Sequence, residues 1–227
     1  MKKAGILCAS DTELAPFLKV MEVSRVTEKA MLKFYEGTIQ GIPAVAVYSG
    51  VCKVNAAVAA ELLIEVYGAD AVINAGAAGG IDPQIQVFDT VVAERAVYHD
   101  VAKDILTEFH PWMPSVYFSS DEDLLSAARK YAETARHPVV FGTIATGEAF
   151  IENEGRERLR RKYAPLAADM ETAGAAHVCY VNQVPFLAVR TVTDTDEESG
   201  AEAFERNCER ACEIVAEVTV GLLREWV

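Results

Sequence analysis

Short apolar runs alternate with amphipathic stretches along the whole chain, and this alternation restricts the fold to the α/β class. Runs such as 5–9 and 71–75 have the length and apolar content of buried strands. The run 184–192 is largely apolar on both faces, which is typical of a strand in a sheet covered by helices on both sides. We therefore expect one α/β domain over residues 1–227.

The same patterns predict where the individual elements lie. Strands are expected at 5–9, 23–38 (with a turn), 43–49, 71–75, 90–98, 139–146, 166–169 and 186–192. Helices are expected at 11–20, 51–67, 121–135, 152–163, 171–181 and 202–226. A Gly-rich loop is expected at 76–80, and the irregular segment 100–120 is expected to be a functional or mobile loop.

The composition excludes several classes of partner. The 227 residues are 51% hydrophobic and 24% charged, as in soluble globular domains. The net charge of −13 argues against nucleic acid and anionic membrane surfaces as partners, so a small-molecule substrate is expected. No stretch approaches the roughly 20 apolar residues of a membrane helix, and the first apolar run is too short for a signal peptide.

The cysteines point to a reducing compartment. Five cysteines without regular spacing argue against a disulfide framework, and a cytoplasmic location is expected. Cys8 and Cys179 lie in apolar runs and are expected in the core. Cys208 and Cys212 are one helical turn apart without a nearby histidine, so no metal is expected there.

The first strand ends in a motif with two interpretations. Ser10 and Glu13 have the spacing of a capping box, which would begin the first helix. The end of a strand is also where open α/β sheets build active sites. Glu13 is therefore a candidate for both roles, because one carboxylate can fill them together.

The Gly-rich stretch 74–80 lacks the marks of known nucleotide motifs. No Gly-Lys-Ser/Thr follows it, which excludes a Walker loop. Ile81, Asp82 and Pro83 stand where a dinucleotide-binding helix would continue. Close approach of the backbone to a ring or a sugar remains open, beside a plain strand-to-loop turn.

Two later strand ends carry carboxylates. Asp169 and Glu171 lie at a turn into an Ala-rich helix, where they could serve chemistry or only complement the helix dipole. Arg190 lies inside an apolar strand that ends at Asp194, and a buried arginine needs carboxylate partners on neighbouring crossings. Asp194 could be a site residue or a cap, and the metal-like spacing Asp-x-Asp-x-Glu that begins there lacks the EF-hand glycine.

His99 precedes Asp100 at the end of another strand. The pair resembles a general base with its orienting carboxylate, but no serine or cysteine nucleophile stands in a recognisable setting. We expect His99 to be structural or to lie at a subunit contact.

Taken in order, these motifs resemble the bacterial 5′-methylthioadenosine/S-adenosylhomocysteine nucleosidases of the nucleoside phosphorylase superfamily. The resemblance runs nearly end to end. It is carried by the stretches 5–13, 49–57, 74–80, 98–100, 147–151, 169–171 with 176–179, and 189–194. It implies a three-layer α/β/α sandwich with a central mixed, largely parallel sheet, no cofactor, no metal and a homodimer.

The resemblance also implies roles for individual residues. Glu13 matches the carboxylate that activates the attacking water, and Asp194 matches the acid that protonates the purine at N7. Glu171 matches the carboxylate that holds the ribose hydroxyls, with Met170 against the sugar. The remaining matches are Phe150 and Ile151 at the base, Arg190 supporting the carboxylates, Phe204 closing the pocket, and further substrate contacts at Ala9, Val51, Ala77, Gly79 and Thr193.

The chain departs from the family pattern at several positions. Ser10 stands where methionine is usual, Cys52 where glycine is usual, and Ala77 and Thr193 each where serine is usual. Segment 100–120 also departs, so the 5′ substituent of the substrate is left open. The alternatives are a futalosine-type hydrolase or other purine nucleosidase, a phosphorylase, which the lack of phosphate-binding arginines disfavours, and a non-catalytic nucleoside-binding protein.

Overall fold

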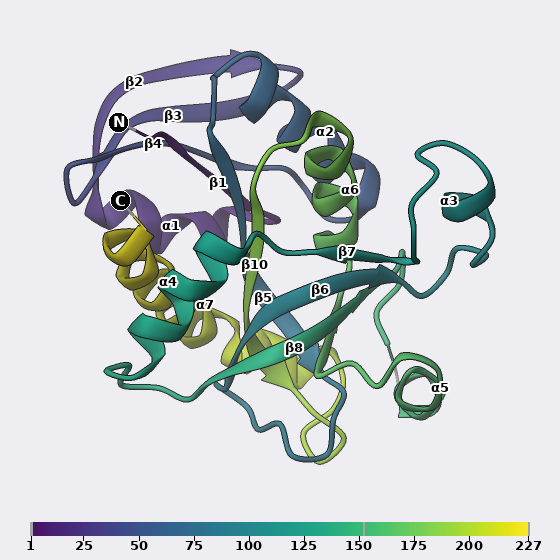
Figure 1. Cartoon of the computed structure of the whole chain (residues 1–227). Helices are drawn as coiled ribbons and strands as arrows, with labels where there is room; N and C mark the ends of the chain where they lie inside the picture. The colour runs from purple at the N-terminus through teal and green to yellow at the C-terminus, as the bar shows by residue number, and fades with distance from the viewer. Residues whose placement is uncertain (1, 152, 227) are drawn as a thin grey trace.

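The computed structural model describes residues 2–151 and 153–226. It contains a ten-stranded mixed sheet flanked by helices (Figure 1). In chain order the elements are β1 (Ala4–Cys8), α1 (Asp11–Val20), β2 (Met21–Lys29), β3 (Leu32–Ile39), β4 (Ile42–Tyr48), α2 (Lys53–Glu65), β5 (Ala71–Gly80), β6 (Thr90–Tyr98), α3 (Ile105–Glu108), β7 (Tyr117–Ser119), α4 (Glu122–Ala132), β8 (Val139–Thr146), α5 (Asn153–Tyr163), β9 (Ala167–Asp169), α6 (Thr172–Asn182), β10 (Phe186–Asp194) and α7 (Ala201–Trp226).

Strand β5 is the centre of the sheet. It pairs in parallel with β1 and with β10, and its last residues pair antiparallel with β9. Strand β10 also pairs antiparallel with β6, which pairs in parallel with β8, and β8 pairs with β9. The strands β5, β10, β6, β8 and β9 therefore close on one another, while β4, β3 and β2 extend the sheet beyond β1.

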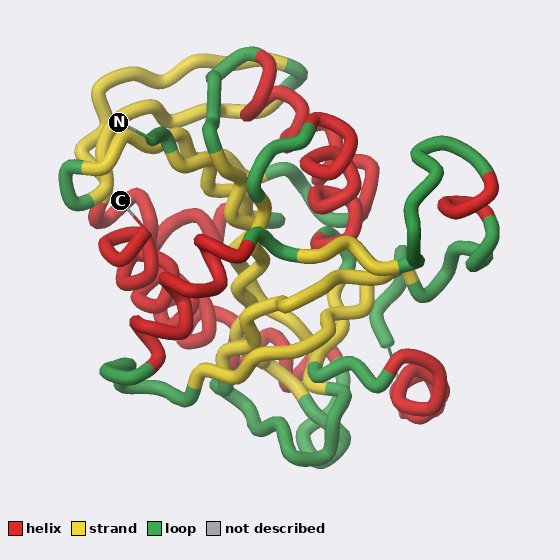
Figure 2. The backbone as a smooth tube through the Cα atoms, viewed as in Figure 1, coloured by secondary structure: helices red, strands yellow, loops and turns green. Residues whose placement is uncertain are grey.

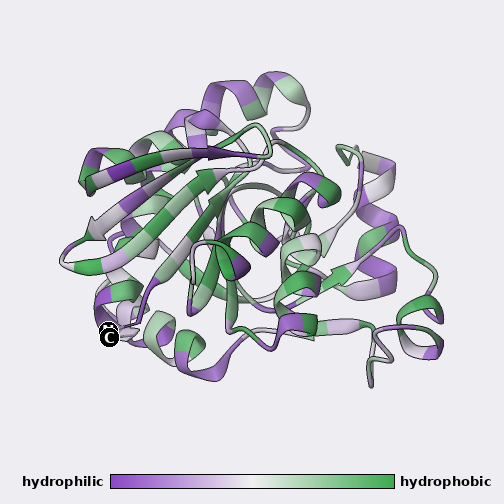
Figure 3. Cartoon of the chain, turned by 90° about the horizontal axis from the view of Figure 1, so that it is seen from above, coloured by the Kyte–Doolittle hydropathy of each residue, from purple (hydrophilic) through white to green (hydrophobic). Residues whose placement is uncertain are grey.

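Helices cover the sheet on both sides, which confirms the predicted α/β architecture. Helices α2 and α6 lie side by side on one face, and α1, α4 and α7 lie on the other (Figure 1). One buried cluster packs Leu63 and Ala176 against the sheet, and the other packs Phe17 and Val215 against its opposite face. Hydrophobic residues predominate on the strands in the interior, and the surrounding helices carry both hydrophobic and hydrophilic residues (Figure 3).

The Gly-rich stretch 76–80 is strand and not the predicted loop. Strand β5 runs through it to Gly80, because β10 pairs with it as far as Gly79 and β9 takes its other edge. Local composition resembles a turn, but hydrogen bonds to two neighbouring strands override it. The backbone of these residues therefore lies within the sheet, between β10 and β9 at its end.

Segment 100–120 carries short elements that the sequence pattern does not predict. It contains helix α3 and strand β7, which pairs with β6, and the part around α3 projects from the body of the molecule (Figure 2). Glu152, where the helix predicted at 152–163 begins, lies outside the described residues, and α5 is described from Asn153. Within the described residues, no helix is long and apolar enough to cross a membrane.

Candidate active site

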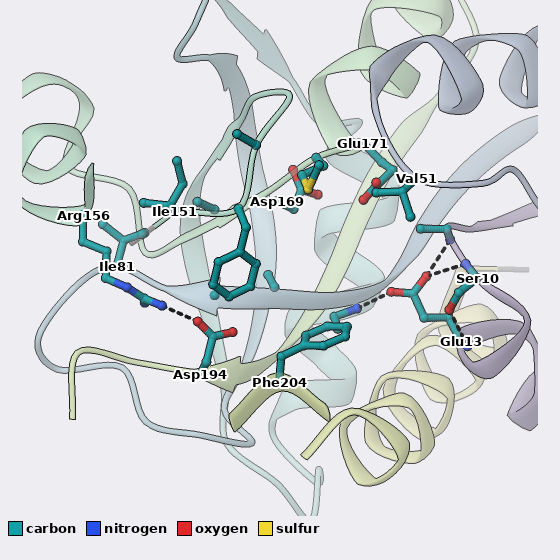
Figure 4. A pocket seen from close by; sticks show the side chains of 18 residues that line it. Ser10, Glu13, Val51, Ile81, Ile151, Arg156, Asp169, Glu171, Asp194 and Phe204 are labelled. Atoms are coloured by element: carbon teal, nitrogen blue, oxygen red, sulfur yellow. Dashed lines mark hydrogen bonds and ion pairs between the residues drawn. The ribbon is translucent and has the colours of Figure 1, made fainter. Parts of the chain in front are cut away.

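A cavity of about 280 Å³ opens at the carboxyl ends of β1, β5, β9 and β10. The close-up shows Glu13 and Asp194 on opposite sides of this cavity (Figure 4). The lining residues are Ala9, Ser10, Glu13, Val51, Ala77, Ala78, Gly79, Ile81, Ala149, Phe150, Ile151, Arg156, Ala168, Asp169, Met170, Glu171, Asp194 and Phe204.

Glu13 is a fixed and buried carboxylate. The capping box is present: Ser10 Oγ accepts from the Glu13 amide at 3.2 Å, and Glu13 Oε2 accepts from the Ser10 amide at 3.2 Å. Glu13 Oε2 also accepts from the Ala9 amide at 2.5 Å, and Oε1 accepts from the Ala77 amide at 2.8 Å. Helix α1 and strand β5 thus hold this carboxylate in one orientation, so the cap and the site role are compatible.

Arg190 binds three carboxylates beneath the cavity floor. Its guanidinium Nη2 lies 2.8 Å from Asp169 Oδ2 and 3.3 Å from Glu171 Oε2, and Nη1 lies 3.8 Å from Glu13 Oε1. The side chain is fully buried, and Nη2 also donates to Asn74 Oδ1 at 2.6 Å. The expectation that a buried Arg190 pairs with carboxylates on neighbouring crossings is confirmed.

Glu171 combines burial with one fixed donor from the facing loop. Its Oε1 accepts from the Cys52 amide at 2.8 Å. Burial raises the pKa of Glu171 from 4.5 to about 7, with Asp169 and Glu13 adding to the rise and Arg190 opposing it. Cys52 has a φ of 83°, a conformation that favours glycine, so a non-glycine residue here is strained.

Asp194 is buried at the other end of the cavity. Burial raises the pKa of its carboxyl above the ordinary value, while Arg156 and the Thr193 hydroxyl oppose the rise. Thr193 Oγ1 donates to Asp194 Oδ1 at 2.9 Å, and Arg156 donates to Asp194 Oδ2. A carboxyl with a raised pKa opposite an anchored carboxylate is an arrangement suited to separate acid and base roles.

Apolar side chains form the walls between these two ends. Phe204, Ile81 and Ile151 lie around the cavity (Figure 4), and Phe150 also lines it. Met170 lines the part of the cavity near Glu171. Flat apolar walls with a few polar groups at the ends are typical of a site for an aromatic base and a sugar.

Comparisons with known proteins agree with this geometry. The model of the phosphorylase superfamily matches residues 3–224. A 5′-methylthioadenosine/S-adenosylhomocysteine nucleosidase of Geobacillus kaustophilus is 35% identical over 227 aligned residues, covering 97% of this chain and 96% of that protein. The chain belongs to the 5′-methylthioadenosine/S-adenosylhomocysteine nucleosidase family.

Solved structures similar to this nucleosidase-family chain include complexes. The nucleosidase of Colwellia psychrerythraea, in complex with adenine, is 32% identical with a TM-score of 0.89, covering 99% of this chain and 95% of that one. The nucleosidase of Neisseria meningitidis, in complex with methylthio-immucillin-A, is 29% identical with a TM-score of 0.90 and 99% coverage of both chains. A futalosine hydrolase of Helicobacter pylori is 26% identical with a TM-score of 0.89, covering 99% and 98%.

Most residues that the family resemblance assigns to substrate binding lie on the cavity wall. Two do not: Arg190 and Thr193 are fully buried behind it. Arg190 binds the carboxylates, and Thr193 donates to Asp194 and lies near the Ala78 carbonyl. The contacts of Arg190 agree with the role that the resemblance implies for it, support of the carboxylates. Thr193 contacts the general-acid candidate Asp194, and its assignment as a substrate contact stays a prediction.

Sequence reasoning missed Arg156, which lies at the cavity beside Asp194. Its helix α5 carries several arginines, and charge alone does not distinguish one of them. A helical spacing does: Leu159 and Tyr163 follow Arg156 at three and seven residues, and all three are buried. The apolar face of α5 could therefore have identified Arg156 as the inward-facing cation.

Segment 100–120 and His99 lie outside the cavity wall. Within the described chain, none of residues 100–120 lines the cavity, and Trp112 is 67% exposed. Asp100 accepts from Lys53 Nζ at 2.8 Å, so its main partner is a lysine and not His99. Among the described residues, no group of three or more histidine, cysteine, aspartate or glutamate side chains could hold a metal ion.

Proposed function

We propose that this chain is a hydrolase that cleaves the N-glycosidic bond of a 5′-modified adenine nucleoside, of the 5′-methylthioadenosine or S-adenosylhomocysteine type, and releases adenine. The observation that carries the proposal is the pair of buried carboxyl groups, Glu13 and Asp194, on opposite sides of one apolar cavity (Figure 4). Its substrate is a small neutral nucleoside, and it needs no cofactor.

Asp194 is the general acid in this proposal. Burial raises the pKa of its carboxyl, which favours the protonated form that a general acid requires. The proton passes to N7 of the purine while the C1′–N9 bond breaks and its electron pair moves into the ring. Adenine then leaves as a neutral molecule, and the sugar is left with the oxocarbenium character typical of glycoside cleavage.

Glu13 is the general base for the attacking water. The carboxylate accepts a proton as the water oxygen forms its bond to C1′, which completes hydrolysis. Its anchoring by the Ala9 and Ala77 amides keeps it aimed at the cavity. At about 5 Å and an effective dielectric near 20, this carboxylate would repel a phosphate charge by roughly 3 kcal/mol, so water is favoured as the nucleophile.

The remaining site residues bind the substrate. Glu171 accepts hydrogen bonds from the ribose hydroxyls, and Met170 packs against the sugar. Phe150, Ile151 and Phe204 enclose the base, supported by their place on the cavity wall. The contacts of Ala9, Val51, Ala77 and Gly79 complete the lining.

A second candidate function is futalosine hydrolysis. The similarity to the Helicobacter pylori futalosine hydrolase supports it. Ser10, which lines the cavity where the family usually has methionine, leaves room for a more polar 5′ group. The same acid, base and ribose contacts would serve either substrate.

The proposal includes a cytoplasmic homodimer. Exposed apolar side chains on α2 and α6 support a subunit contact on that face: Val54 is 72% exposed, and Tyr180 and Val181 are each 41% exposed. The two helices pack side by side (Figure 1), so these side chains belong to one surface.

Adenine release tests the function. The purified chain is incubated with 5′-methylthioadenosine, S-adenosylhomocysteine, adenosine and futalosine, with and without phosphate, and the free base and sugar are identified. We expect free adenine and free sugar at a rate independent of phosphate. In Asp194→Asn, kcat should fall by about 10²- to 10⁴-fold, because the side chain no longer donates a proton.

Other outcomes would reject the proposal. A sugar 1-phosphate would identify a phosphorylase, and binding of nucleosides without turnover would identify a binding protein. Activity of folded Asp194→Asn within about threefold of the wild type would remove Asp194 as the general acid, since that role contributes about 10²-fold or more.

A further inference from the structure

Arg156 is the charged side chain that contacts the general acid. It comes from α5 and is 1% exposed, although nothing in the family resemblance assigns it a role. One guanidinium nitrogen donates to Asp194 Oδ2 and the other donates to the Gly80 carbonyl of β5. The guanidinium is thus fixed between the acid and the central strand.

The surroundings of this pair contain few other charges. Asp196 Oδ1 lies 3.7 Å from Arg156 Nε, and Asp196 is partly exposed and bonds Arg160 of the same helix. From α7, the neutral Asn207 donates to the Thr193 carbonyl at 2.9 Å. Arg156 Nε has no hydrogen-bond partner among the described residues, so the guanidinium is oriented mainly by Asp194 and Gly80.

A buried general acid has a particular electrostatic problem. A general acid is a neutral carboxyl before proton transfer and a carboxylate afterwards, and at Asp194 that carboxylate would form in a side chain that is 1% exposed. Forming an unpaired buried anion is unfavourable. A fixed cation beside it interacts far more strongly with the anion than with the neutral acid, so it stabilises the state that the reaction creates.

We propose that Arg156 is a positioning residue for the reaction: it fixes the Asp194 carboxyl and stabilises the carboxylate that forms as the proton moves to the purine. The inference rests on the proposed function, because it requires Asp194 to be the general acid. Arg156 is then a residue that affects both kcat and the pH above which activity is lost.

The contact between Arg156 and Asp194 also affects the pH at which Asp194 loses its proton and activity declines. Burial raises the pKa of Asp194, and the positive charge of Arg156 opposes that rise. Removal of the charge therefore leaves Asp194 protonated to a higher pH. A purely structural role for Arg156 would change stability but would not move the basic limb of the pH profile.

The experiment measures kcat and KM for adenine release from 5′-methylthioadenosine across the pH range in which each variant stays folded. In Arg156→Gln and Arg156→Met we expect kcat to fall by about tenfold or more, a part of the contribution of general acid catalysis. The basic limb should move to higher pH, with little change in KM. Arg156→Lys should restore part of the rate and return the basic limb towards its wild-type position.

Arg160→Gln is the matched control. Arg160 lies one turn further along α5 and binds Asp196 and the Ile81 carbonyl, but it does not contact Asp194. This variant should leave the basic limb unchanged. In an Asp194→Asn background, Arg156→Gln should cause no further loss of kcat, because its effect acts through the acid.

An unchanged basic limb in both Arg156→Gln and Arg156→Met would overturn the inference. The inference would also be overturned if Arg156→Gln lowered kcat in the Asp194→Asn background by as much as it does in the wild type. If both neutral variants fail to fold, Arg156→Lys decides. A basic limb near the wild-type position with at least part of the wild-type kcat supports the inference, and a basic limb displaced to higher pH overturns it. Wild-type activity of Asp194→Asn would instead refute the general-acid assignment itself.

Discussion

At the scale of single residues, the site contains more carboxyl groups than cations to pair with them. Arg190 faces Asp169, Glu171 and Glu13, and it cannot fully neutralise all three. Glu171, at 3.3 Å from the guanidinium, is less strongly paired than Asp169, at 2.8 Å. Burial is the main cause of its raised pKa of about 7, and the incomplete pairing with Arg190 only partly opposes it.

The raised pKa of Glu171 predicts that kcat/KM decreases on the acid side of the pH profile. As the pH falls through about 7, Glu171 gains a proton and loses the charge that binds the ribose hydroxyls. We expect kcat/KM to fall on that side and Glu171→Gln to remove this limb while lowering kcat/KM above pH 7. A pH series of kcat/KM for both proteins measures it, and an identical acid limb in the variant would assign it to another group.

The same group acts on stability with the opposite sign. A carboxyl whose pKa rises on folding stabilises the native state most in its protonated form. The contribution of Glu171 is complete below about 4.5 and is lost as the pH rises through about 7. Binding competence and this part of the stability therefore change in opposite directions over one pH window.

At the scale of elements, β5 supplies the surface against which the site is built. Gly76 leaves the space that Glu13 and Arg190 occupy: a Cβ there would lie 2.3 Å from Glu13 Oε1 and 2.5 Å from Arg190 Nη1. Both neighbours are buried and hydrogen-bonded, so they have little freedom to move. The glycine is required by close approach of side chains and not by a turn.

Gly76→Ala should displace Glu13 and reduce kcat by about tenfold or more, since a misplaced base loses much of its contribution. The measurement is kcat of the folded variant, with circular dichroism as the check on folding. Gly142→Ala is the matched control. Gly142 lies in β8 and does not line the cavity, and a Cβ there would lie 2.7 Å from Leu166 Cδ1. It should lower stability but keep kcat, and an equal loss of kcat in both variants would contradict the argument.

Features that depend on neighbouring residues in the sequence are predicted correctly. Features that depend on contacts with residues remote in the sequence are missed. The capping box of Ser10 and Glu13 is local, and the structure contains it. The strand character of 76–80 depends on β9 and β10, which are remote in sequence. The role of Arg156 depends on Asp194, 38 positions away, so its own helix gives only the weak signal of an inward face.

At the scale of the whole molecule, the exposed apolar face of α2 and α6 bears on assembly. Val54 and Val58 lie one turn apart on α2 and are 72% and 43% exposed. Burial of such side chains in a subunit contact would stabilise a homodimer, since each buried CH₂ contributes about 0.8 kcal/mol. Substitution by charge would oppose that burial.

If the proposed homodimer forms through this face, we expect the wild type to be dimeric and the double variant Val54→Glu, Val58→Glu to be monomeric. Sedimentation equilibrium at several protein concentrations measures this. Val26→Glu is the control, because Val26 is 49% exposed on β2, away from α2 and α6. A dimer that persists in the double variant would place the contact on another surface.

The anchoring of Glu13 has a consequence for unfolding. Its carboxylate accepts a hydrogen bond from the amide of Ala77, which is 64 positions further along the chain. It also forms an ion pair with Arg190, which is 177 positions further along. Early, middle and late segments of the chain thus meet at the substrate cavity, and none of them forms it alone. A bound ligand resists unfolding of the entire fold and not of one loop, and at a hundred times its Kd it would add about 2.7 kcal/mol to the free energy of global unfolding.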